Sequence, residues 1–177
     1  MFLKFINKFL DLIDIVIQRD YYGFIQGHSY IKKKTIDKIK KDNSNLLVRN
    51  FENKFSSLIG DGDTTSFASA RMCFYAFMKA IGIKEKDEVI LNGSTCAVMV
   101  NAVIRIGAVP VFSDISPITF GSCPEGIKKV LTNKSKLIVA QHSFGIPCEI
   151  NKIRELAKSK NIFLLEDCAL SVGSKYM

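Results

Sequence analysis

Residues 64–103, TTSFASARMCFYAFMKAIGIKEKDEVILNGSTCAVMVNAV, restrict the fold of this chain more than any other segment. The spacing of apolar residues in this segment predicts five consecutive elements: a strand at 64–69, a tight turn at Ser69-Ala70-Arg71, a helix from Arg71 to about Ile81, a strand at 88–92 and a helix that opens near Thr95. Such a unit presents its turns on one edge of a sheet.

The turn at Ser69 has the chemistry of an anion site. Ser69 stands where an N-cap residue is expected, so the backbone N–H groups near Arg71 and Met72 should lack intrahelical partners. Unpaired N–H groups and the positive end of the helix dipole together attract an anion. Taken alone, Ser69 is better explained as a residue that only caps a helix.

The rest of the chain repeats the alternation of helix and strand. The pattern predicts a helix at 46–59, a strand at 109–113, a helix at 124–131, a strand at 136–140, a helix at 150–158 and a strand at 162–165. We therefore expect an α/β fold with three layers, α/β/α, around a mainly parallel sheet. The continuous apolar run 162–165 is typical of a strand that is buried on both faces.

The first 45 residues differ from the remainder, so we divide the chain into 1–45 and 46–177. Residues 2–18 predict an amphipathic helix whose charges exclude a transmembrane span, and packing within or between chains is favoured over membrane contact. The basic run 32–41 contributes to the net charge of +8, but it lacks interleaved aromatic residues. It is therefore interpreted as a solvated helix face rather than a nucleic-acid site.

The cysteines and histidines do not form a metal-binding pattern. Five cysteines stand far apart with no C-x-x-C pair, and the chain has two histidines. Scattered, unpaired cysteines are typical of reduced thiols, so we expect a cytoplasmic protein without a metal. His142 follows a predicted strand and lacks the partners of a catalytic triad, which favours a hydrogen-bonded structural histidine.

Several motifs occur in the order found in a known family. They are Ser69-Ala70-Arg71, Ala80-Ile81-Gly82-Ile83, Asp87-Glu88-Val89-Ile90, Thr95 with Asn101-Ala102-Val103, 107–112, Gln141-His142-Ser143-Phe144-Gly145 and Glu166-Asp167-Cys168-Ala169. Over about residues 50–177 the chain thereby resembles the DegT/DnrJ/EryC/StrS sugar aminotransferases. The resemblance implies an aspartate-aminotransferase-like fold that carries pyridoxal 5′-phosphate (PLP). It also implies transfer of an amino group to keto-sugar nucleotides, as in the biosynthesis of cell-surface polysaccharides.

The resemblance implies which residues contact the cofactor. The phosphate would lie at Ser69, Ala70, Arg71 and Met72, and the pyridine nitrogen at Asp167. Cys96 replaces the family's usual aromatic residue, either stacking on the PLP ring or serving only as a small buried residue. Leu170 replaces a Gln or His near the phenolic oxygen and cannot donate a hydrogen bond. Without the resemblance, Asp167 would be interpreted as the cap of a helix at 168–172.

The family's Schiff-base lysine has no counterpart in these 177 residues. We therefore expect an incomplete PLP-dependent transferase large domain that binds PLP weakly or not at all and is inactive alone. A homo-oligomer or a missing C-terminal part would complete it. The alternatives are a non-enzymatic truncated homologue that binds a phosphate ligand or a partner chain, and a generic nucleotide-binding domain with its ligand at Gly60-Asp61-Gly62.

The resemblance also implies the order of the strands. The strand at 88–92 should lie between those at 109–113 and 136–140, with the strand at 162–165 beside the latter. The strand at 64–69 should lie at the far side of the sheet, separated by two further strands. In the absence of those strands, 162–165 should be an unprotected apolar edge that can pair with another chain.

Overall fold

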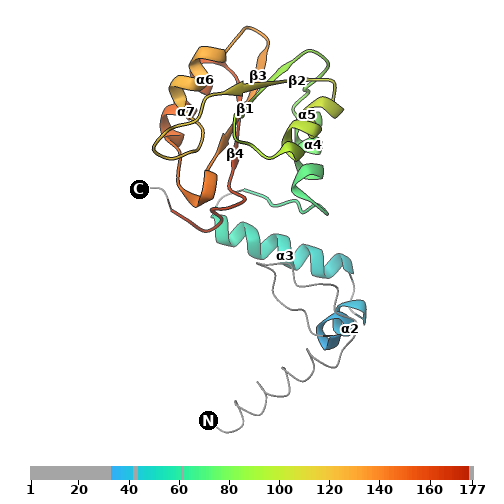
Figure 1. Ribbon diagram of the computed structural model, residues 1–177. Helices are drawn as coiled ribbons and strands as arrows, with labels where there is room; N and C mark the ends of the chain where they lie inside the picture. Colours follow the sequence, from blue (N-terminus) through green and yellow to red (C-terminus); the bar gives the residue numbers. More distant parts are fainter. Residues whose placement is uncertain (1–32, 42–43, 61, 176–177) are drawn as a thin grey trace. The chain divides into compact units, whose positions relative to one another are not determined.

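Strand β1 (Glu88–Asn92) forms the centre of the fold, because Val89, Ile90 and Leu91 have no exposed surface. The structure, a computed structural model shown in Figure 1, describes residues 33–41, 44–60 and 62–175. Its other strands are β2 (Val109–Ser113), β3 (Ser135–Gln141) and β4 (Phe163–Asp167). Its helices are α2 (Lys33–Lys41), α3 (Ser44–Ile59), α4 (Ala70–Ala80), α5 (Ala97–Arg105), α6 (Pro124–Val130), α7 (Ile150–Lys160) and the short 3₁₀ helix Ser143–Gly145.

The four strands form one parallel sheet in the order β2-β1-β3-β4. This order confirms the predicted placement of β1 between β2 and β3, with β4 beside β3. The observed bounds of β1 and β2 are also those expected from the sequence. In both strands, a mainly apolar run ends at a polar residue, Asn92 in β1 and Ser113 in β2.

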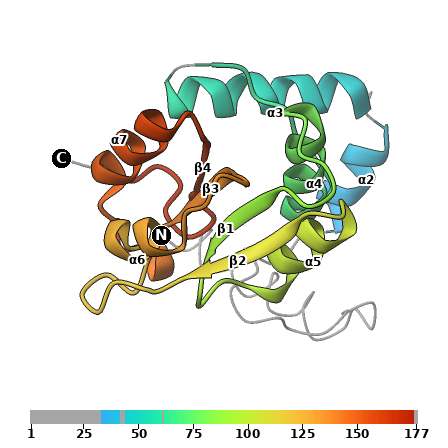
Figure 2. The same cartoon turned by 90° about the horizontal axis from the view of Figure 1, so that it is seen from above.

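Alternating side chains of the sheet form two apolar clusters, one on each face. Val89 and Leu91 pack with residues of α4 and α5, such as Phe74 and Met99. Ile90 faces the other way and packs with residues of α6 and α7. Figures 1 and 2 show the two pairs of helices on opposite sides of the sheet. The predicted three-layer α/β/α architecture is therefore confirmed.

Polar turns set the limits of the helices next to β1. Helix α4 ends before Gly82, whose φ of +80° is the left-handed conformation expected there. Helix α5 begins at Ala97 rather than near Thr95. The side-chain oxygen of Asn92 accepts hydrogen bonds from the N–H and the hydroxyl of Ser94, at 2.8 and 2.9 Å. Those bonds hold a turn after β1, and the helix starts only when this turn is complete.

The predicted strand at 64–69 is wrong. These residues are extended or bent but pair with no strand in the described part of the chain. The N–H and the hydroxyl of Ser66 instead donate to Glu52 Oε1 in α3, at 2.7 and 2.8 Å. These bonds, the backbone one first, lower the pKa of Glu52. Residues 64–69 therefore form an extended connection between α3 and α4 and not a strand, because a strand requires a neighbour for its N–H and C=O groups.

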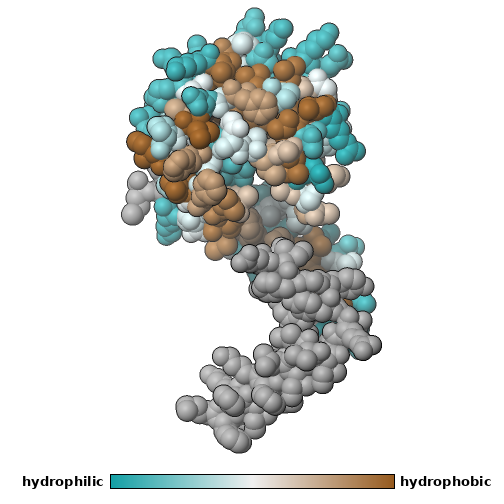
Figure 3. Space-filling view, viewed as in Figure 1, coloured by the Kyte–Doolittle hydropathy of each residue, from teal (hydrophilic) through white to brown (hydrophobic). Residues whose placement is uncertain are grey.

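One expectation about the end of the chain is also wrong. Strand β4 is not buried on both faces: Phe163 is 51% exposed, and Leu164 and Leu165 are half-buried. It lies at the edge of the sheet, so β3 covers one side of it among the described residues. Residues 168–172 form turns, which does not support the alternative interpretation of Asp167 as the cap of a helix there. Figure 3 shows apolar side chains, in brown, on the surface of the α/β unit that contains this edge.

The chain divides into two compact units, residues 1–47 and 48–177. In the first unit, α2 is basic and fully exposed, as expected for a solvated helix. The amphipathic helix predicted at 2–18 lies outside the described residues. Among the helices that the structure does describe, none combines the length and apolar character needed to cross a membrane. The second unit contains the sheet and every residue of the candidate site.

Candidate functional site

A pocket of about 250 Å³ lies at the carboxyl edge of the sheet. From β1 the chain crosses to β2 on one side and then returns to β3 on the other. Loops that leave neighbouring strands in opposite directions open a crevice at this point, where ligands bind in open α/β sheets. The pocket is lined by residues that follow or end β1, β3 and β4: Thr95, Cys96, Gln141, His142, Asp167, Ala169 and Leu170.

Asp167 is the charged residue of this pocket. It ends β4, and its Oδ1 accepts the N–H of Ala169 at 3.1 Å, which holds the turn that follows. In the described part of the chain, its second carboxylate oxygen has no hydrogen-bond partner. A carboxylate held this way can accept a hydrogen bond from a cationic N–H group in a ligand.

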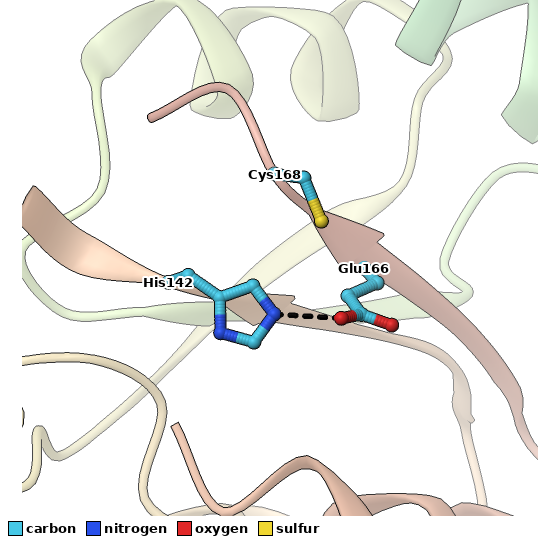
Figure 4. A group of neighbouring side chains, drawn as sticks. All are labelled: His142, Glu166 and Cys168. Carbon is cyan, nitrogen blue, oxygen red and sulfur yellow. Dashed lines mark hydrogen bonds and ion pairs between the residues drawn. The ribbon is translucent and has the colours of Figure 1, made fainter. Parts of the chain in front are cut away.

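His142 lies beside Asp167 but is engaged within the protein. Its Nε2 lies 2.7 Å from Glu166 Oε1 (Figure 4). The backbone N–H of Cys148 donates to its Nδ1 at 3.1 Å. A backbone N–H can only donate, so Nδ1 carries no proton and the ring hydrogen is on Nε2, facing the carboxylate. His142 is 6% exposed and is the hydrogen-bonded histidine that the sequence predicts.

The structure also brings Cys168 close to this pair, although the sequence spacing shows no metal motif. The ligand atoms of His142, Glu166 and Cys168 lie within 4.8 Å of one another. Burial, followed by the Glu166 and Asp167 charges, raises the pKa of the Cys168 thiol. A protonated thiol and an imidazole nitrogen that bears hydrogen are both poor metal ligands. The cluster therefore suits a hydrogen-bonded pair better than a metal centre.

The N-terminus of α4 is a second polar feature at this edge of the sheet. A short loop joins the end of α4 to the start of β1, so the helix runs antiparallel to the strand and begins at the strand's carboxyl end (Figure 1). Ser69 caps it, with its Oγ accepting the N–H of Met72 at 3.3 Å. The expected cap at Ser69 is therefore confirmed, and it uses the Met72 N–H. The N–H groups of Ala70 and Arg71 have no partner in the described part of the chain.

The candidate residues from the sequence fall into separate places. Cys96, Asp167 and Leu170 share the pocket described above, and Leu170 is 66% exposed. Ser69 and Ala70 instead line a hollow of about 230 Å³ beside Phe51 and Phe55 of α3. Arg71 and Met72 line neither space.

Gln141 also lines the pocket, although the sequence pattern did not indicate it. Gln141 is the last residue of β3 and is the register partner of Asp167 in β4. Residues in register on neighbouring strands project from the same face of a sheet, so both can reach the same pocket. The sequence signal that could have found it is its position at a strand end, directly before the buried His142.

Comparisons with known proteins match most of the chain to one enzyme family. The sequence model of the DegT/DnrJ/EryC1/StrS aminotransferase family matches residues 35–177. GDP-perosamine synthase of Escherichia coli O157:H7 is 39% identical over 129 residues, which are 73% of this chain and 35% of that protein. The chain spans about a third of the length of the curated relatives it matches.

Two solved structures share the arrangement of helices and strands. The aminotransferase from Psychrobacter cryohalolentis superposes with a TM-score of 0.78 at 29% identity, over 88% of this chain and 41% of that one. NtdA from Bacillus subtilis, with its cofactor PMP bound, superposes with a TM-score of 0.71, over 89% of this chain and 41% of that one. The latter is 22% identical and shows a likeness of fold alone.

Proposed function

This chain belongs to the DegT/DnrJ/EryC1/StrS aminotransferase family, and we propose that its α/β unit forms one side of the PLP site of an aminotransferase acting on keto-sugar nucleotides. The observation that carries the proposal is Asp167, which ends β4 with a carboxylate oxygen available to a ligand in the pocket. The similarity to GDP-perosamine synthase supports a nucleotide-linked sugar as substrate. Membership of an aminotransferase family supports PLP as the cofactor.

The residues at the carboxyl edge of the sheet match the charges of PLP. The cofactor has a phosphate at one end and a basic pyridine nitrogen at the other. The N–H groups of Ala70 and Arg71, at the positive end of α4, suit the phosphate. Asp167 suits a protonated pyridine nitrogen, because an adjacent negative charge favours the protonated form of the ring. When bound, PLP supplies an electron sink for the transfer of the amino group.

Other residues of the pocket position Asp167 and limit its contact with water. The N–H of His142 donates to the backbone carbonyl of Asp167 at 3.3 Å, which ties the ends of β3 and β4 together. Cys96 and Leu170 supply apolar walls. The Cys96 thiol offers a small, soft surface to a ring, with less contact area than an aromatic side chain.

We assign cofactor binding, and not proton transfer, to the residues that line the pocket. Amino transfer requires a base that moves a proton at the substrate carbon, a role that the family gives to lysine. The residues that line the pocket in the described part of the chain include no lysine. We therefore expect reversible PLP binding without turnover from these residues alone.

The test is equilibrium dialysis of the purified 177-residue chain against PLP, with pyridoxal, which lacks the phosphate, as the competing probe. PLP should bind more tightly than pyridoxal, and Asp167→Asn should weaken PLP binding about ten-fold, because a charge-assisted hydrogen bond becomes a neutral one. Asp63→Asn, at an exposed carboxylate outside the pocket, is the control and should bind as the wild type does. Equal binding by Asp167→Asn and the wild type would overturn the proposal.

A further inference from the structure

The side-chain amide of Gln141 is poorly satisfied within the protein. Its Oε1 is buried and has no hydrogen-bond partner among the described residues. Its Nε2 makes one long contact, 3.4 Å, with the hydroxyl oxygen of Ser143. Exchanging the oxygen and nitrogen of the amide does not remove the problem, because the buried position still lacks a partner. A buried polar group that lacks a partner inside a protein requires an explanation, and one such explanation is a ligand that it meets.

The position of Gln141 indicates which ligand it meets. It lines the pocket together with Asp167, its register partner on the neighbouring strand. Cys96 and Leu170, on the same pocket, offer a weakly polar thiol and an apolar side chain. Gln141 therefore places a side-chain amide beside the Asp167 carboxylate. An amide can both donate and accept hydrogen bonds.

We propose that Gln141 is a second cofactor-binding residue, whose amide turns into the pocket and hydrogen-bonds a polar atom on the edge of the ring that Asp167 holds by its nitrogen. This inference rests on the proposed PLP site. The backbone of Gln141 is fixed by β3, while its long contact with Ser143 leaves the amide easy to rotate. When the amide rotates, it loses the long contact with Ser143 and gains a hydrogen bond to the ligand. The amide oxygen is then no longer buried without a partner.

Removal of the Gln141 amide should have opposite effects on the stability of the protein without cofactor and on its affinity for PLP. Gln141→Met keeps an unbranched chain of similar length and removes the amide. The variant without cofactor should be at least as stable as the wild type towards urea, because it no longer buries an unpartnered polar group. Its affinity for PLP should fall roughly three- to ten-fold, as expected for the loss of one hydrogen bond.

The experiment measures both quantities on the full 177-residue chain, by urea unfolding and by equilibrium dialysis with PLP as the probe. Gln141→Leu is a second variant in case Gln141→Met does not fold. Asn101→Leu, which removes an exposed amide on α5, is the matched control and should leave PLP affinity unchanged.

The outcomes separate this inference from the proposed function. If the wild type does not bind PLP, the proposed function and this inference are both overturned. If the wild type binds PLP and the two Gln141 variants bind it equally well, the PLP site stands and Gln141 is not part of it. If removal of the amide lowers the stability of the empty protein, the amide is satisfied within the fold, and the inference is overturned.

Discussion

His142 Nε2 lies 2.7 Å from Glu166 Oε1, while Asp167, the next residue along β4, has its side chain on the other face of the sheet. Two consecutive carboxylates thereby receive different environments. Glu166 is held by an imidazole N–H, whereas Asp167 keeps an oxygen for the pocket. The alternation of a β-strand is sufficient to produce this division.

Removal of the Glu166 carboxylate should destabilise the protein. Glu166→Ala leaves the buried Nε2–H of His142 without an acceptor, which should lower the free energy of unfolding by about 1–3 kcal/mol. Glu166→Gln can still accept this hydrogen bond through its amide oxygen, so its loss should be smaller. Urea denaturation of the two variants checks the prediction. Equal losses would show that the hydrogen bond is not what the carboxylate contributes.

Stability should fall at alkaline pH because of Cys148. Burial, followed by the Glu166 charge, raises the pKa of its thiol from 9.0 to about 11. Between pH 9 and 11 the unfolded chain loses this proton while the folded chain keeps it, so the thiol's contribution is complete below pH 9 and lost towards pH 11. The pKa shift corresponds to a loss of up to about 3 kcal/mol in the free energy of unfolding.

Cys148→Ala provides the comparison for this pH dependence. The variant has no thiol to ionise, so its free energy of unfolding should change less between pH 9 and 11 than that of the wild type. The measurement is a series of urea unfolding curves across this range. Parallel pH profiles for the two proteins would contradict the prediction.

Ser69 should contribute both to helix stability and to phosphate binding. Ser69→Ala removes the cap that accepts the Met72 N–H and should cost about 1 kcal/mol. Ser69→Asp can still cap the helix, but its negative charge should repel a phosphate at the Ala70 and Arg71 N–H groups. Urea unfolding and PLP dialysis should therefore separate the two roles. An aspartate variant that binds PLP as tightly as the wild type would exclude phosphate from this helix terminus.

The exposed edge of β4 should promote self-association. Phe163→Lys should keep the protein monomeric at higher concentration than the wild type, because a charge on an edge strand opposes pairing with another chain. The opposite edge provides a matched control in Val109→Lys. There the N–H of Val109 faces β1 and the next residue, Pro110, offers no outward N–H, so that edge is a poorer template.

Light scattering over a range of concentrations checks this prediction. The wild type and Val109→Lys should associate at similar concentrations, and Phe163→Lys only above them. If both lysine variants associate equally little, general surface hydrophobicity and not the β4 edge drives the association.

Local sequence patterns predicted those elements whose partners lie within the chain. β1, β2 and the helices α4 to α7 have apolar faces that meet in two clusters, so local pattern and tertiary packing agree. Residues 64–69 have the same β-like composition but no neighbouring strand among the described residues, and Glu52 holds them instead. The pattern of a segment does not specify whether another strand is present to receive it.

The candidate site was predicted only where a residue's own chemistry indicated a role. Asp167 was singled out because a carboxylate after a strand is informative within the resemblance to the family. The contact between His142 and Glu166 joins residues that are 24 positions apart. The role that we propose for Gln141 depends on its register with Asp167. Both relationships are set by how β3 and β4 align, which the sequence of either strand does not state.

The pocket is built almost entirely from side chains that the two apolar clusters do not use. Cys96 and Leu170 follow strand ends, are exposed and belong to neither cluster. A substitution at either position changes the wall of the pocket without opening a hole in the core. Ligand preference in this unit can therefore diverge one residue at a time, while folding is maintained by a different set of residues.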